Sequence, residues 1–251
     1  MVAIKLELLE IMQGSFSLIY ITITLILIIV ILGKFLKNKK SELLFLSLAI
    51  LGLMGAWTSD AVVFLVILLT NASLNEAFYL AITIKVALTI GVFYVPFAIF
   101  CWLIVITKLL FLKNRKIILI IAGIICIIFE IIFILLFLID IALIADFRGP
   151  FDYQWSLIPA IFLISAIMIV LTTGIVFTQR SLRSEKVEIK LKGKLILIGV
   201  LLFFLGAVLP YLVYNIVIIV ITRIVLTISS IAFYIGFILP NWARRIFKVE
   251  G

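Results

Sequence analysis

The sequence predicts an all-α fold, a polytopic membrane protein built as a seven-transmembrane helix bundle, from its composition and the length of its apolar runs. Of 251 residues, 67% are hydrophobic and 13% are charged, and the mean hydropathy is +1.46. So few charged residues cannot cover a water-facing surface, whereas a helix crosses a bilayer with about 20 apolar residues. Seven such runs occupy most of the chain, so residues 1–251 are expected to form one membrane domain. The expected helices are 13–36, 43–70, 77–107, 117–145, 156–180, 195–220 and 223–243.

The basic residues predict the orientation of this bundle. Of the 21 Lys and Arg residues, 17 follow the first, third, fifth and seventh runs, at Lys34, Lys37, Lys39, Lys40, Lys108, Lys113, Arg115, Lys116, Arg180, Arg183, Lys186, Lys190, Lys192, Lys194, Arg244, Arg245 and Lys248. Because cytoplasmic loops carry an excess of Lys and Arg, we expect the N-terminus outside and the C-terminus in the cytoplasm of a multi-pass cell-membrane protein. These residues can also attract anionic lipid, so the net charge of +9 requires no nucleic-acid partner.

Two other interpretations of the apolar runs are disfavoured. A cleaved signal peptide has an apolar stretch of roughly 7 to 15 residues and an Ala-x-Ala site, and the first run is longer and lacks that site. Barrel strands alternate polar and apolar residues over about 10 positions, whereas these runs contain unbroken blocks of Ile, Leu and Val. Helices are therefore expected throughout.

The scarcity of reactive side chains excludes several kinds of chemistry. The chain has no histidine, which removes His-ligated zinc sites, Ser-His-Asp arrangements and imidazole proton shuttles. Cys101 and Cys126 stand alone in apolar stretches, without a partner at metal or redox spacing, and are expected to be small buried hydrophobes. We therefore expect no metal site, no cofactor and no enzymatic activity.

An acid and a base are expected at similar depth in the second and third helices. Asp60 lies ten residues before Thr70, about 15 Å from the outer end of its helix. Lys85 lies nine residues after Glu76, about 13 Å from the outer end of the next helix. Since an isolated charge inside a bilayer costs about 2.5 to 3.5 kcal/mol, Asp60 and Lys85 are a credible ion pair. The pair either locks two helices together or forms the floor of an outward-facing polar cavity.

Asp140 and Arg223 extend this expected cavity. Asp140 lies six residues before Asp146, about 9 Å below the outer end of the fourth helix. Arg223 lies at the outer boundary if the turn between the last two helices falls near Ile221. If Asn215 makes the turn instead, Arg223 lies deeper and can reach Asp140 or Asp60.

Two tyrosines and one glutamate complete the set of candidate site residues. Tyr211 and Tyr214 share an expected helical face with Asn215, just after a kink expected at Pro210. Glu130 is expected near the middle of the membrane with no basic residue at its depth, so it is neutral or hydrogen-bonded to another helix. A proton-coupled step would use such a residue, although a neutral acid that bridges two helices is an equally good explanation.

The end of the chain carries a resemblance to a known family. The stretch from Phe233 to Arg245, which includes Gly236 and a Pro240-x-Trp242-x-Arg244 pattern, resembles the exit from the seven-transmembrane input module of some prokaryotic sensor histidine kinases. The match covers those residues, and beyond them only the helix number and orientation. The resemblance implies a sensory membrane module that passes a signal into the cytoplasm; it assigns no ligand residue, and no kinase follows Gly251 in this sequence.

These features together favour a receptor-like membrane sensor. Asp60, Lys85, Asp140 and Arg223, with Tyr211 and Tyr214, would bind a small polar or zwitterionic ligand from the outer side and signal to a separate cytoplasmic protein. The alternative is a small membrane transporter, proton-coupled if Glu130 takes part. An aspartyl enzyme using Asp60 and Asp140 ranks third, because neither residue lies in a Gly-x-Gly-Asp setting, and a structural scaffold remains open.

Overall fold

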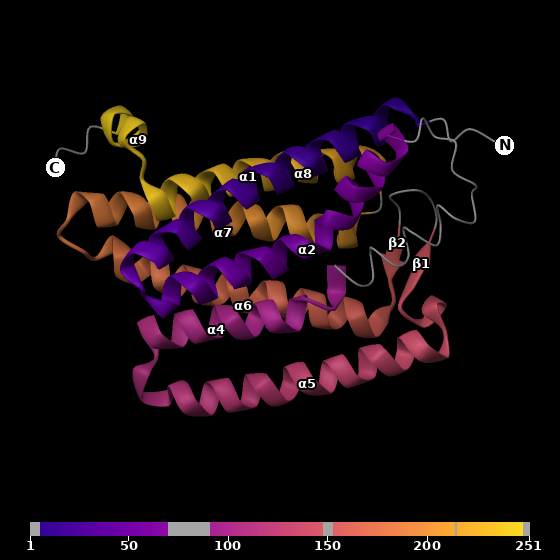
Figure 1. Cartoon of the computed structure of the whole chain (residues 1–251), viewed down its shortest axis with the longest axis horizontal. Coiled ribbons are helices and arrows are strands. Elements are labelled where there is room, and N and C mark those ends of the chain that lie inside the picture. The colour runs from indigo at the N-terminus through magenta and orange to yellow at the C-terminus, as the bar shows by residue number, and fades with distance from the viewer. Residues whose placement is uncertain (1–5, 70–90, 148–152, 214, 248–251) are drawn as a thin grey trace.

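The computed structural model describes residues 6–69, 91–147, 153–213 and 215–247, and these form a helical bundle (Figure 1). Among these described residues, six helices are long and apolar enough to cross a bilayer, counting α5 together with the 3-10 turn that precedes it. The chain is accordingly a multi-pass membrane protein with an all-α bundle. The helices are α1 (Leu8–Asn38), α2 (Ser41–Leu69), α4 (Val95–Leu110), α5 (Arg115–Ile139), α6 (Leu157–Leu182), α7 (Val187–Leu212), α8 (Ile216–Ile238) and the short α9 (Asn241–Ile246).

Six of the helices close into a ring. In order around the ring, α1 packs on α2, α2 on α4, α4 on α6, α6 on α7, α7 on α8, and α8 returns to α1. α5 lies outside this ring, against α4 (Figure 1). Its contact with α6 includes the stacked rings of Phe129 and Phe162, whose centroids are 3.7 Å apart. The remaining faces of α5 expose isoleucine and leucine, as expected for a helix that contacts lipid.

The two ends of the bundle differ in charge. The turns after α1, α4 and α6 and the short α9 lie at one end, on the left of Figure 1, and they carry the basic residues of these connections. The start of α1, the turn between α7 and α8 and a small hairpin lie at the opposite end (Figure 1). We refer to them below as the α9 end and the hairpin end.

The third expected helix is only partly described. The α-helix begins at Val95, with Pro96 in its first turn, where a proline fits without breaking a hydrogen bond. Pro96 therefore lies at a helix start rather than inside a continuous α-helix. Residues 77–90 of the expected helix lie outside the described residues.

The last two long helices are offset from their expected positions. α7 begins at Val187 rather than near residue 195, because Glu188 and Lys192 form an i,i+4 ion pair (2.6 Å) that supports about two extra polar turns. The turn to α8 falls at Asn215, whose Oδ1 accepts a hydrogen bond from the Val217 N–H (2.8 Å). The turn expected near Ile221 is therefore wrong, and the alternative at Asn215 is the one observed. Tyr211 and Asn215 consequently do not share one helical face.

The fourth expected helix ends early. α5 stops at Ile139, and Asp140 takes an extended conformation and caps a 3-10 turn over Ile141–Leu143. The chain then forms an antiparallel hairpin in which β1 (Ala145–Phe147) pairs with β2 (Tyr153–Trp155), so Asp146 lies opposite Gln154. This connection thus adds a small two-stranded sheet to the otherwise helical part of the chain that the structure describes.

Glycines allow the closest helix contacts. A methyl group added at Gly14 of α1 would overlap the Phe64 ring of α2. Added at Gly206 of α7, it would lie 2.7 Å from Leu226 of α8, and at Gly199 it would lie 2.8 Å from Phe233. Small residues at such seams let helix backbones approach closely in a membrane, where packing replaces the hydrophobic effect as the main attraction between helices.

Candidate intramembrane polar site

A buried ion pair joins α2 to α8 near the hairpin end. Arg223 Nη2 lies 2.7 Å from Asp60 Oδ2, and the two residues are 8% and 2% exposed. Arg223 is seven residues into α8, about 10 Å from the helix start. Each charge neutralises the other, which removes most of the cost of placing either one alone at this depth.

The first helix contributes a third member to this pair. The Gln13 amide of α1 donates a hydrogen bond to Asp60 Oδ2 (3.4 Å), and Gln13 is 3% exposed. Asp60 therefore accepts from two helices at once. Tyr20 and Tyr211 lie within electrostatic range of the Arg223 charge. Within the described part of the chain, the buried Arg223 Nε has no hydrogen-bond partner, so the guanidinium keeps one donor uncommitted.

A second polar contact joins α1 to α8 further along both helices. The Thr24 hydroxyl lies 2.9 Å from the Ser230 hydroxyl and donates to the Tyr20 carbonyl at 2.8 Å. Thr24 is 3% exposed and Ser230 is 4% exposed. Thr24 lies eleven residues after Gln13, about 16 Å along α1, so this contact is separate from the ion pair.

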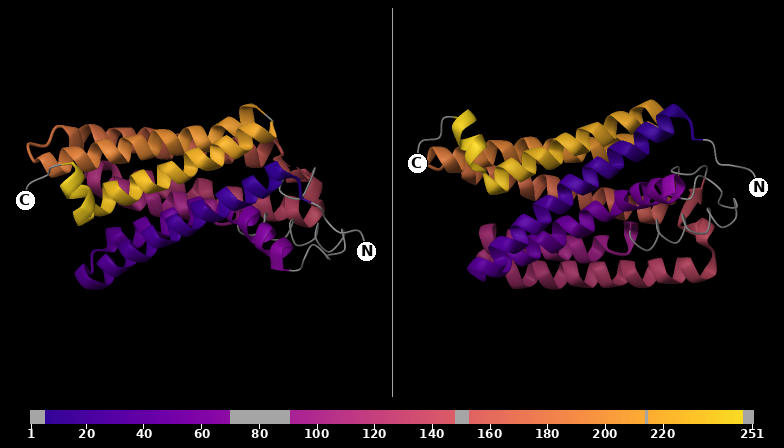
Figure 2. Two further views of the ribbon diagram at one scale, coloured as in Figure 1. Left: turned by 90° about the horizontal axis from the view of Figure 1, so that it is seen from above. Right: turned by 45° about the horizontal axis from the view of Figure 1, so that its top comes forward.

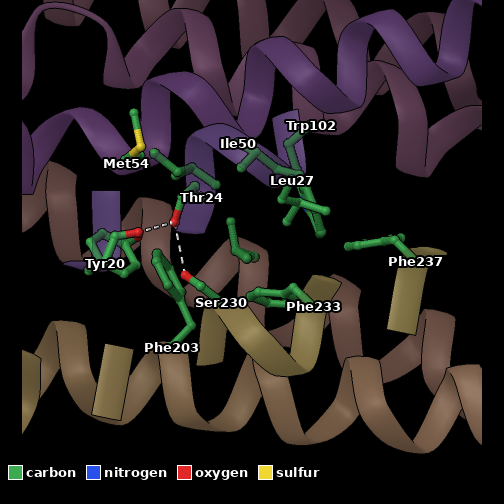
Figure 3. A pocket seen from close by; sticks show the side chains of 12 residues that line it. Tyr20, Thr24, Leu27, Ile50, Met54, Trp102, Phe203, Ser230, Phe233 and Phe237 are labelled. Carbon is green, nitrogen blue, oxygen red and sulfur yellow. Dashed lines mark hydrogen bonds between the residues drawn. The ribbon is translucent and has the colours of Figure 1, made fainter. Parts of the chain in front are cut away.

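A cavity of about 40 Å³ lies beside Thr24 and Ser230, in the centre of the ring (Figure 3). All six ring helices contribute to its wall, which is mostly aromatic and aliphatic. The lining residues are Tyr20, Thr24, Leu27, Ile50, Leu53, Met54, Trp102, Val170, Phe203, Ser230, Phe233 and Phe237. The cavity lies on the α9 side of the ion pair.

The candidate residues from the sequence do not all come together. Asp60 and Arg223 form the pair described above, and half-buried Tyr211 lies in the last turn of α7, near Arg223. Asp140 lies apart from them, exposed beyond the end of α5, where its Oδ1 accepts from the Ala142 N–H (2.9 Å). Lys85 and Tyr214 lie outside the described residues, and so does the expected ion pair of Asp60 with Lys85.

Glu130 is apart from this site, on the outer helix α5. It is half-buried, and its Oε2 is enclosed without a hydrogen-bond partner among the described residues. One turn earlier on α5, the Cys126 thiol donates to the Pro96 carbonyl of α4 (3.4 Å). Glu130 therefore lies close to the seam between α5 and α4, away from the Asp60–Arg223 pair.

Sequence reasoning missed three members of the polar contacts: Gln13, Thr24 and Ser230. A signal was present in the first apolar run, where Gln13, Ser17, Tyr20 and Thr24 recur at intervals of four, three and four residues. That spacing places them on one helical face. A polar face within an otherwise apolar membrane helix indicates contact with other helices rather than with lipid.

The arrangement offers groups for binding and charge recognition. Among the described residues, no group of three or more His, Cys, Asp or Glu side chains is placed to hold a metal ion. What the site offers is a neutralised pair of opposite charges, a partly unsatisfied guanidinium and a separate cavity with hydroxyl groups in its wall. Comparison of the chain with protein-family models, with curated proteins and with solved structures finds no match.

Proposed function

We propose that the chain is a receptor-like sensor of the cell membrane, which binds a small ligand at the Asp60–Arg223 pair and signals to a separate cytoplasmic protein. In this proposal the hairpin end faces outward and the basic α9 end faces the cytoplasm, following the distribution of Lys and Arg. The observation that carries the proposal is the buried pair itself, because one contact between α2 and α8 holds opposite charges that a ligand can replace.

The charges of the pair suggest a zwitterionic ligand. An ammonium group would replace Arg223 as the partner of Asp60, and a carboxylate would replace Asp60 as the partner of Arg223. A ligand with a single charge would leave one buried protein charge unpaired, which is strongly unfavourable. Insertion of both groups would separate α2 from α8 at this depth.

The route to the cytoplasmic side in this proposal is α8 itself. α8 leads through Leu239 and Pro240 into α9, where Arg244 Nη2 contacts Glu188 Oε1 of α7 at 3.0 Å. The Arg244 Nε also donates to the Leu239 carbonyl (3.4 Å). The resemblance of this segment to the exit of a sensor module is part of the support for a signalling role. A displacement of α8 would change how α9 presents its basic residues to a partner.

A ligand screen tests the proposal directly. The purified protein in lipid nanodiscs is heated with free amino acids, and with the corresponding amines and carboxylic acids as singly charged controls. At least one amino acid is expected to raise the unfolding temperature, since a ligand that binds the folded state stabilises it by mass action. Asp60→Asn is expected to remove that effect.

The matched control is Glu42→Gln, which breaks another ion pair, with Lys108 (2.7 Å), at the α9 end. This variant is expected to keep the ligand effect. Stabilisation that survives in Asp60→Asn, or that is absent across the whole panel, contradicts the proposal.

A transporter is the second candidate, and one specific observation favours it. In the right view of Figure 2, α1 and α8 start side by side at the hairpin end and separate toward the α9 end, and both helices contribute residues to the wall of the central cavity. A site between helices that can move relative to one another is what alternating access requires. Uptake of a stabilising amino acid into proteoliposomes, dependent on a pH gradient and abolished by Glu130→Gln, would establish transport; binding without uptake would leave the sensor.

A further inference from the structure

The hydroxyl pair beside the cavity has a fixed direction of hydrogen bonding. Thr24 has one hydroxyl proton, which it donates to the Tyr20 carbonyl at 2.8 Å. The contact of 2.9 Å between Thr24 and Ser230 must therefore be donated by Ser230. Both protons are used, and the Thr24 oxygen also has a hydrogen bond with the Tyr20 side chain, so the capacity that remains at this contact is the oxygen lone pairs of Ser230.

The other polar groups of the wall do not supply a donor to the cavity. The Trp102 Nε1–H donates to the Thr173 hydroxyl at 2.8 Å. The Tyr20 phenol forms a hydrogen bond with the Thr24 side chain and also lies in range of the Arg223 charge, so it is engaged as well. Among the described lining residues, the cavity thus offers acceptors at one point and apolar surface elsewhere.

The residues of the cavity wall limit which kind of molecule can bind there. An anion would find no donor here, and a cation would find no carboxylate, so either charge would be unpaired at a depth where that is costly. Water has a hydrogen-bond partner only at Ser230, whereas a buried water typically uses about three, and cavities with apolar walls tend to stay dry. A neutral molecule with an apolar body and one hydroxyl satisfies both parts of the wall.

The size of the cavity limits that molecule. A single water needs roughly 10 to 15 Å³, so the observed volume of about 40 Å³ has room for about three non-hydrogen atoms, or four with a small adjustment of side chains. Met54 in the wall is a flexible side chain that can make such an adjustment. Short-chain alcohols have this size.

We propose that the central cavity is a binding site for a small neutral molecule of the alcohol class, whose hydroxyl donates to Ser230 and whose carbon atoms contact the aromatic wall. This site is separate from the Asp60–Arg223 pair. It does not depend on whether the bundle is a sensor or a transporter.

Cysteine protection tests the proposal. Val170 lines the cavity and is replaced in Val170→Cys, in a background of Cys101→Ala and Cys126→Ala. Methyl methanethiosulfonate, a small neutral reagent, transfers its methylthio group to the Cys thiolate; a disulfide forms and methanesulfinate leaves. The rate of this reaction is measured with 2-propanol, acetone or acetate present, three probes that each have four non-hydrogen atoms but differ in donor and charge.

The expected result is protection by 2-propanol alone. One net hydrogen bond corresponds to about fivefold in binding, so 2-propanol should protect about five times better than acetone, and acetate should not protect. In Thr24→Val the Ser230 proton loses its acceptor and becomes available to a ligand. The preference for 2-propanol over acetone is then expected to disappear or reverse.

Two controls keep the outcome decisive. Val200→Cys is equally buried but does not line the cavity, and its reaction should not respond to 2-propanol. Met54→Cys places a second reporter in the same cavity, on α2. If either Val170→Cys or Met54→Cys fails to fold, the other variant still provides the measurement. Equal protection by acetone, no protection by any probe, or failure of both cavity cysteines to react would overturn the proposal; unprotected but reactive cysteines would mean that water alone enters.

Discussion

Helices α8 and α5 cross the same bundle but use polar residues in opposite ways. α8 buries Thr222, Arg223, Ser229 and Ser230, and each hydroxyl or guanidinium among them has a hydrogen-bond partner. α5 buries only Cys126, Phe129 and Phe133, and its carboxyl, Glu130, has an enclosed oxygen with no partner in the described part of the chain.

This difference in polar residues follows from the number of helices that pack against α8 and α5. α8 lies in the ring between α1 and α7, so polar side chains on two of its faces can reach another helix. α5 lies outside the ring and relies on α4 and on aromatic stacking with Phe162 of α6. A polar side chain in a membrane helix is stable where a second helix supplies its partner, and lipid supplies none.

The largest expected effect comes from breaking the ion pair of α8. Asp60→Asn leaves the Arg223 charge buried without its counterion, and we expect a loss of about 3 kcal/mol of stability, measured by reversible unfolding in mixed micelles. Arg223→Gln should cost a similar amount. The double variant should be about 1 to 3 kcal/mol more stable than the sum of the single effects predicts. If the losses of stability in the two single variants simply add in the double variant, Asp60 and Arg223 do not stabilise each other.

The next effect concerns the close packing of α8. Gly206→Ala on α7 places a methyl group 2.7 Å from Leu226 and 3.2 Å from the Thr222 carbonyl of α8, and should cost about 1 to 3 kcal/mol. Gly123→Ala is the matched change on α5, where the nearest atom is Phe100 Cε2 at 3.4 Å. There we expect a gain of about 0.5 kcal/mol, because alanine favours helix. Equal responses in thermal unfolding would show that both helices are packed alike.

A smaller loss of stability is expected when a single hydroxyl group of α8 is removed. The Ser229 hydroxyl donates to the Gly199 carbonyl of α7 at 2.8 Å, and Ser229→Ala should cost about 0.6 kcal/mol, the average for hydrogen bonds between membrane helices. Ser165→Ala serves as the control, since that hydroxyl bonds within its own helix, to the Ile161 carbonyl (2.7 Å). An equal loss of stability in Ser165→Ala would contradict the expectation that a hydrogen bond between helices stabilises the bundle more than one within a helix.

The smallest effect is expected at Glu130. Its enclosed oxygen makes no hydrogen bond among the described residues, so Glu130→Gln removes no contact that these residues provide. The unfolding free energy should stay within about 0.5 kcal/mol of the parent protein at neutral pH. A loss as large as that of Asp60→Asn would show that α5 also depends on a polar contact.

Composition and the spacing of basic residues were sufficient to predict a membrane bundle of apolar helices. They were not sufficient to place the site, because contacts between α1 and α8 arise when the ring closes, and no local pattern encodes that closure. The apolar residues from Leu195 to Ala243 contain no polar loop, so the turn at Asn215 could not be separated from one near Ile221. The position of this turn decides whether Arg223 lies deep enough in the bundle to reach Asp60.

Asp140 shows a different limit of sequence reasoning. Apolar residues continue after it from Ile141 to Ala145, so the helix was expected to continue too. Asp140 instead caps a new turn, which an Asp side chain does well because it accepts backbone N–H bonds. By contrast, the spacing of Gln13, Ser17, Tyr20 and Thr24 does indicate one polar face, and this face marks the side of α1 that packs against the bundle.

The glycine seams restrict which parts of the bundle can move. Contacts at Gly206, Gly199 and Gly236 hold α7 to α8 from Thr222 to Gly236, a length of about 21 Å, and the Arg244–Glu188 contact ties α9 to the same pair. Gly14 holds α1 to α2 against Phe64 in the same manner. Neither helix of a pair can slide without forcing its partner to repack. A motion that widens the central cavity is therefore a relative rotation of two rigid helix pairs, with the α1–α8 boundary as its axis.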